Sequence, residues 1–131
     1  MLTPTYIYAT PVPRQVTTIY GRHIDLDPHY ADPSYGLKWD QHFAAARFED
    51  AERYVTDIFE KVKAVYKPQH PEIGAGDNYL KESGDWSEDG NGHWYRLTHE
   101  VWANGHGTST TLAEYHIHTS RIIESIKYID K

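Results

Sequence analysis

The stretch that decides the fold is residues 41–67, QHFAAARFEDAERYVTDIFEKVKAVYK. Apolar side chains recur through it at alternating spacings of four and three, which is the period of an amphipathic α-helix. Asp40 can cap the start of this helix, and Pro68 and Pro71 end it. The pattern predicts one helix of about 26 residues, roughly 40 Å long. Its apolar stripe consists of Ala44, Phe48, Ala51, Val55, Ile58, Val62 and Val65.

An alternative interpretation makes residues 43–48 a strand and begins the helix at Glu49 or Asp50. The good helix formers at positions 44–47 favour the longer helix. On the outer face of the helix, Glu49 precedes Arg53 and Asp57 precedes Lys61 by four residues. Both spacings predict ion pairs that support the helix.

The segments on either side of this helix are typical of antiparallel strands. Upstream, residues 6–9 and 16–26 are rich in β-branched and aromatic types, with a turn expected over 11–15. Downstream, residues 93–103 and 108–119 flank Asn104-Gly105, a strong hairpin signal. Residues 28–38 and 67–92 are expected to be loops, the second one long enough to suggest a function. The segment 121–131 fits either a helix or a last strand, and we prefer the strand.

Together these elements predict one domain, residues 1–131, of the α+β class. It would contain an antiparallel sheet of four to five strands, two N-terminal and two to three C-terminal. One long helix would pack on a face of that sheet.

Composition excludes several classes of function. The 131 residues include 13 Lys plus Arg and 19 Asp plus Glu, a net charge of −6, and no Cys. Nucleic-acid binding is not expected, because phosphate contacts need clustered cations. The absence of Cys excludes disulfide frameworks and thiolate metal sites. Neither a membrane-spanning run nor a signal peptide is recognisable, so we expect a cytoplasmic protein without a membrane partner.

One group of polar residues suggests catalysis. His23 and Asp25 alternate with apolar residues, so an extended strand would place them on one face. With His116 they could form an acid–base pair or bind a divalent transition metal. The same alternation is also typical of any half-buried strand with a solvent-exposed face.

A second group of histidines lies in the predicted hairpin. If Ala103 paired with Thr108 around a four-residue loop, His93 would lie opposite His118, with His116 close by on the same face. Three imidazoles are the ligand set of some catalytic zinc sites. A register change of one residue would move His93 to the other face.

Two functions remain open at this level. The 11 Tyr and 4 Trp favour a small acidic binding or inhibitor-type protein without a cofactor, acting on a protein partner or a small-molecule ligand. Such a domain would suit an accessory factor of a phage or mobile element. The alternative is a metal- or His-dependent hydrolase or lyase acting on a small polar substrate. Either could be a homo-oligomer. The candidate binding residues are Tyr79, Trp86, Trp94, Tyr95 and Tyr115.

Overall fold

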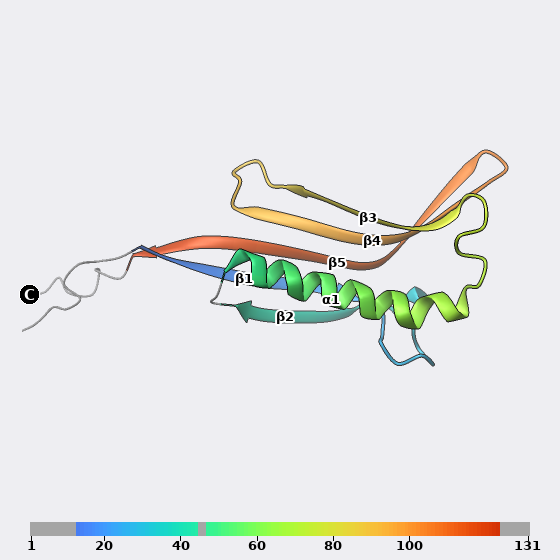
Figure 1. The fold of residues 1–131 in the computed structure, drawn as a ribbon, viewed down its shortest axis with the longest axis horizontal. Helices are drawn as coiled ribbons and strands as arrows, with labels where there is room; N and C mark the ends of the chain where they lie inside the picture. Colours follow the sequence, from blue (N-terminus) through green and yellow to red (C-terminus); the bar gives the residue numbers. More distant parts are fainter. Residues whose placement is uncertain (1–12, 45–46, 124–131) are drawn as a thin grey trace, which may run out of the picture.

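A computed structural model describes residues 13–44 and 47–123, which form one five-stranded antiparallel sheet with a helix across one face (Figure 1). The order of strands in the sheet is β2-β1-β5-β4-β3. The predicted α+β class, with two strands before the helix and three after it, is confirmed. The elements are β1 (Pro13–His23), β2 (Lys38–Ala44), α1 (Phe48–Tyr66), β3 (Asn78–Trp86), β4 (Gly92–Ala103) and β5 (His106–Ile123).

The start of the helix differs from the preferred prediction. Residues 38–44 form strand β2 instead of a first helical turn, and α1 begins at Phe48. Asp40 pairs with Gly21 of β1, so it lies in a sheet ladder and caps no helix. The pairing of β2 with β1 therefore outweighs the helix propensity of this segment, because tertiary contacts override a weak local preference. The alternative of a strand followed by a shorter helix is close to the structure.

The end of the helix and one of its ion pairs agree with the prediction. A 3₁₀ turn, Lys67–Gln69, follows α1 directly at Pro68. Lys61 lies 3.0 Å from Asp57 as expected. Arg53, however, donates over 2.9 Å to Asp50, three residues before it, whereas Glu49 was the expected partner.

The N-terminal strands are arranged differently from the prediction. Residues 6–9 lie outside the described residues. Positions 13–15, expected in a turn, begin strand β1. β1 pairs on one side with β2 and on the other with β5. The expected loop at 28–38 is present up to residue 37 and contains a 3₁₀ turn, Pro33–Tyr35.

The segment 67–92 is not one long loop, because it contains β3 at the edge of the sheet. Most of its residues are exposed, so the strand lacks the alternation by which a half-buried strand is recognised. Pairing with β4 from Asn78 to Trp86 holds it in place. Edge position explains the missed prediction, since an edge strand needs few apolar residues.

The predicted hairpin forms β4 and β5, but its turn is shorter than expected. Ala103 pairs with His106, which leaves Asn104 and Gly105 as a two-residue turn. Both have positive φ, 53° and 79°, as a type I′ turn requires. Residues 121–123 are extended as expected but belong to the end of β5 rather than to a separate strand, whereas 124–131 lie outside the described residues.

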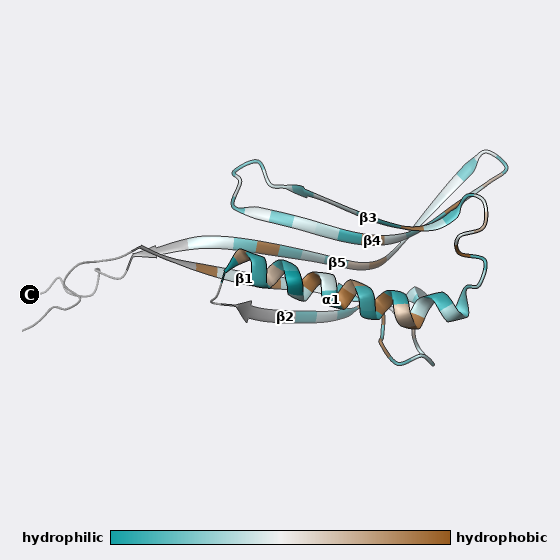
Figure 2. Ribbon diagram, viewed as in Figure 1, coloured by the Kyte–Doolittle hydropathy of each residue, from teal (hydrophilic) through white to brown (hydrophobic). Residues whose placement is uncertain are grey.

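The core lies between α1 and one face of the sheet. Figure 2 shows apolar and polar positions alternating along α1, as expected for an amphipathic helix. From the helix, Ala51, Val55, Ile58, Phe59, Val62 and Tyr66 are buried. From the sheet, they meet Ile19, Leu97, Ala113, Tyr115 and Ile117. The opposite face, called the helix-free face below, is covered by no helix of the described chain (Figure 1).

Candidate functional site

A row of charged and aromatic side chains crosses the helix-free face. Residues that pair directly across a ladder lie on the same face of a sheet. Trp39 of β2 pairs with Arg22 of β1, which pairs with Glu114 of β5, which pairs with Arg96 of β4. Trp94, two residues from Arg96, shares this face. These five residues, the aromatic–arginine row, therefore come from four neighbouring strands.

The members of the row contact one another. Arg22 Nε donates to Glu114 Oε2 over 2.6 Å, and Arg96 Nε lies 3.6 Å from Glu114 Oε1. The Arg22 guanidinium lies 5.4 Å from the centre of the Trp39 ring, and that of Arg96 lies 5.0 Å from the Trp94 ring. Both are within the range of cation–π attraction. One carboxylate thus orients two guanidinium groups, and the row carries a net positive charge.

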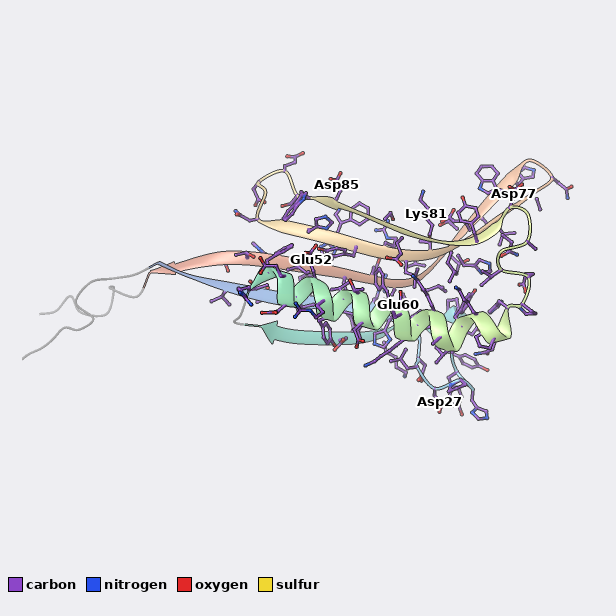
Figure 3. The ribbon with its side chains drawn as sticks, in the orientation of Figure 1. Asp27, Glu52, Glu60, Asp77, Lys81 and Asp85 are labelled. Atoms are coloured by element: carbon purple, nitrogen blue, oxygen red, sulfur yellow. The ribbon has the colours of Figure 1, made fainter. Side chains whose placement is uncertain are left out.

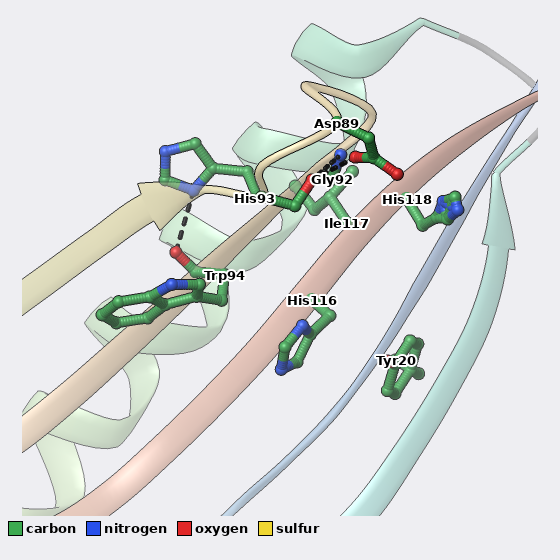
Figure 4. A pocket seen from close by; sticks show the side chains of 9 residues that line it. Tyr20, Asp89, Gly92, His93, Trp94, His116, Ile117 and His118 are labelled. Atoms are coloured by element: carbon green, nitrogen blue, oxygen red, sulfur yellow. Dashed lines mark hydrogen bonds between the residues drawn. The ribbon is translucent and has the colours of Figure 1, made fainter.

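A pocket adjoins the row on the side of the β3–β4 turn. Tyr20 and His116, a directly paired couple, stack with ring centres 5.2 Å apart and planes 7° from parallel. Trp94 pairs with His116 on the next strand. The pocket has a volume of about 220 Å³ (Figure 4). It is lined by Tyr20, Ser87, Asp89, Gly92, His93, Trp94, His116, Ile117 and His118.

The turn between β3 and β4 places a carboxylate at this pocket. Asp89 Oδ1 accepts hydrogen bonds from the Ser87 hydroxyl over 2.6 Å and from the Asn91 amide over 2.9 Å. These bonds, the Ser87 bond above all, hold the pKa of Asp89 below its usual range. Burial lowers the pKa of His116, which favours the neutral imidazole. At neutral pH the pocket therefore combines the Asp89 carboxylate with a neutral His116 ring.

The predicted catalytic residues do not meet. His116 lies on the helix-free face beside Tyr20. His23 lies on the other face, where its ring stacks at 6.4 Å on buried Tyr115. β1 ends at His23, so Asp25 lies in a loop, where it accepts the Asp27 amide over 2.9 Å. A site formed by all three would need side chains from opposite sides of the sheet.

The predicted histidine cluster is also divided between the two faces. His93 pairs with Ile117 and lies on the helix side, stacked on Tyr95 at 4.3 Å. His116 and His118 lie on the helix-free face. At His93 the assumed register was wrong by one residue, because the turn is two residues shorter than assumed and Leu112 is left unpaired in a bulge between β4 and β5. The shorter turn alone would keep His93 on the face of His116, and the bulge moves it to the other face. In the described parts of the chain, no three His, Asp or Glu side chains are grouped to hold a metal.

The predicted binding residues are likewise dispersed. Trp94 lies in the aromatic–arginine row, and Tyr79 shares its face near the opposite end of β3. Tyr115 is fully buried, and Tyr95 donates its hydroxyl to Glu52 of α1 over 2.9 Å (Figure 3). Trp86 is 53% exposed but stacks on Phe48 of the helix.

Sequence reasoning missed four members of the row: Arg22, Trp39, Arg96 and Glu114. Alternation along 16–26 could have placed Arg22 on the face opposite Ile19. The strand order that brings the row together was not available from such patterns.

Two polar networks occupy the helix side of the sheet. Asp40 Oδ2 accepts hydrogen bonds from the hydroxyls of Tyr54, over 2.5 Å, and Tyr115, over 2.6 Å. Further along the helix, the Tyr66 hydroxyl lies 2.7 Å from His99 Nδ1. His99 Nε2 lies 2.6 Å from Asn78 Oδ1. Each network joins α1 to the sheet, which indicates a structural role.

No protein-family model, curated protein or solved structure matches the chain. Among the described residues, no helix has the length and apolar character needed to cross a membrane.

Proposed function

We propose that the chain is a binding protein that recognises a protein partner through its helix-free face. The observation that carries this proposal is the aromatic–arginine row. Trp, Tyr and Arg are the residue types most enriched among the energetically dominant residues of protein interfaces. Here two Trp and two Arg form one contiguous row, and Tyr20 lies beside Arg22 on the same strand face.

The exposure of these residues supports the proposal. Trp39 is 68% exposed and Tyr20 is 42% exposed, although both are large aromatic residues. Association with a partner would remove this apolar area from water, which is the main favourable term in protein association. The row is also organised before binding, because Glu114 and the Trp rings already orient both guanidinium groups. Pre-organised side chains lose less entropy when a partner binds.

The shape and charge of the face favour a protein over other partners. A sheet face presents a broad, shallow surface of the kind that protein interfaces use. Two arginines share one carboxylate, so the row suits a partner surface with apolar groups and a carboxylate. Nucleic acid is a poorer match, because the whole chain has a net charge of −6. The arrangement does not favour the enzyme alternative, because His23 and His116 lie on opposite faces of the sheet and Asp25 lies in a loop.

The test does not require the natural partner. A random peptide library displayed on phage would be selected on the purified wild-type chain. Selected peptides would then be titrated against the Trp39→Ala and Arg22→Ala variants. We expect each substitution to weaken binding about tenfold, the size typical of a central interface residue.

Tyr35→Ala is the matched control, because Tyr35 is 66% exposed but belongs to the 3₁₀ turn outside the sheet. Peptides that bind all variants equally, or a failure to enrich any peptide, would contradict the proposal. Sedimentation velocity of the wild-type chain tests a second copy as the occupant. A dimer that dissociates on Trp39→Ala would replace the proposed foreign partner with self-association.

A further inference from the structure

The pocket beside the aromatic–arginine row has a chemistry different from that of the row itself. We propose that it is an anchor site for a cationic side chain, a lysine ammonium or an arginine guanidinium, of the protein partner. This inference rests on the proposed function and adds the chemical class of the group that the pocket holds.

Aromatic rings line the pocket. Tyr20, His116 and Trp94 occupy one directly paired row across β1, β5 and β4. The faces of aromatic rings carry partial negative charge, so a cation near them is attracted. The parallel stacking of Tyr20 on His116 keeps both rings fixed before a ligand arrives.

A carboxylate gives the rim of the pocket a negative charge. Asp89 points from the β3–β4 turn toward the space beside His118 (Figure 4). Both of its hydrogen-bond donors, Ser87 and Asn91, meet the same oxygen, Oδ1, and fix the carboxylate in place. A second carboxylate, Asp85, pairs with Trp94 near the end of β3 (Figure 3). One carboxylate therefore lies at the pocket rim and a second lies beside Trp94 on β3.

The residues that line the pocket do not favour an anionic ligand. The lining contains one carboxylate and no Lys or Arg. Arg96 lies nearby, but its guanidinium pairs with Glu114 and lies over the Trp94 ring, so it is already engaged within the row. An anionic ligand would meet the Asp89 carboxylate without a Lys or Arg among the lining residues. A cationic side chain instead satisfies the carboxylate and the rings together, and a volume of about 220 Å³ accommodates a lysine side chain.

The proposal can be tested with small probes and the full chain. N-acetyl-lysine methylamide would be titrated into ¹⁵N-labelled wild-type protein and followed by NMR. N-acetyl-norleucine methylamide, which has the same alkyl chain without the ammonium group, is the matched control. We expect saturable shifts at Tyr20, Trp94 and His116 with the lysine probe and weaker, non-saturating shifts with the norleucine probe.

Substitution tests the role of the carboxylate. Asp89→Asn should weaken binding of the lysine probe about fivefold, the upper end for an exposed ion pair. Asp57→Asn is the matched control, because Asp57 is an exposed carboxylate on α1, away from the pocket. Amide spectra of each variant report whether the fold is retained. The wild-type comparison of lysine with norleucine remains decisive if Asp89→Asn disturbs the turn.

Three outcomes would overturn the inference. They are equal binding of the norleucine probe, preferential binding of N-acetyl-glutamate methylamide, and no saturable shift with any probe. The inference and the proposed function can also fail separately. Selected peptides that need Trp39 but contain no basic anchor would contradict only the cationic pocket. If the pocket bound the lysine probe but the phage selection enriched no peptide, only the proposed protein partner would be contradicted.

Discussion

Tyr115 on β5 donates its hydroxyl to Asp40 on β2 over 2.6 Å, although strand β1 lies between them. The residue of β1 that pairs with both is Gly21. A Cβ at position 21 would lie only 2.6 Å from Cγ of the Tyr115 ring and would also meet the Glu114 carbonyl oxygen. The ring of Tyr115 can therefore pass over β1 only because residue 21 has no side chain.

The close approach at Gly21 predicts a large effect of a single methyl group. Gly21→Ala should lower the free energy of unfolding by about 2 kcal/mol or more, because a buried ring and the backbone would both have to move. Urea denaturation measures this loss. Gly92→Ala is the control, since a Cβ there would meet its nearest neighbours at an ordinary 3.4 Å. Equal stability of the two variants would contradict the proposed packing.

The shared carboxylate predicts coupling between two tyrosines. Tyr115→Phe and Tyr54→Phe each remove a hydrogen bond to Asp40 Oδ2. Each should cost about 1.5–3 kcal/mol, the range for bonds to a charged group. A double-mutant cycle by urea denaturation should give a non-additive result, because both hydroxyls meet one oxygen. Tyr35→Phe, at an exposed position, should change stability little. Additive losses would show that the two bonds are independent.

The buried His99 predicts a loss of stability in acid. Burial, with a smaller contribution from His70, lowers the pKa of His99. In the neutral form, Nε2 donates to Asn78 while Nδ1 accepts from Tyr66. The unfolded chain therefore binds a proton near pH 6.5 that the folded chain resists. The free energy of unfolding should fall as the pH drops below about 6.5.

Urea denaturation at pH 7.5 and 5.5 measures this dependence. His99→Gln keeps hydrogen-bonding groups but does not titrate, so its stability should change less between the two values. His116 contributes in the same direction, because burial lowers its pKa as well. If the stability of the His99→Gln variant had the same pH dependence as that of the wild type, a group other than His99 would be responsible for the loss of stability in acid.

The exposed row predicts that binding and stability can be separated. Trp39→Ala should change the free energy of unfolding by less than about 0.5 kcal/mol, as is usual for exposed positions. The same change should weaken peptide binding about tenfold if the helix-free face is the interface. Thermal denaturation of Trp39→Ala beside Tyr35→Ala measures the first quantity. Clear destabilisation by Trp39→Ala would show that the row supports the fold.

Elements whose signals are local could be predicted without the structure. The apolar stripe from Ala51 to Val65 predicts most of α1, and Asn104-Gly105 predicts the β4–β5 hairpin. These patterns also yield the α+β class, although the preferred prediction did not include β2 or β3. Each depends on side-chain spacing or turn chemistry within one segment, so it can be recognised without knowing what lies beside that segment.

The tertiary structure alone decided the strand identities of 38–44 and 78–86 and the composition of the candidate site. β2 and β3 exist because neighbouring strands supply their ladder partners, which local propensity does not reveal. The single unpaired residue, Leu112, places His93 and His116 on opposite faces. Strand order then brings Trp39 beside Arg22 and Arg22 beside Glu114. Side chains alternate between the two faces of a strand, so a shift of one residue in the pairing register moves each of them to the other face. Only the complete set of pairings could therefore determine which side chains meet.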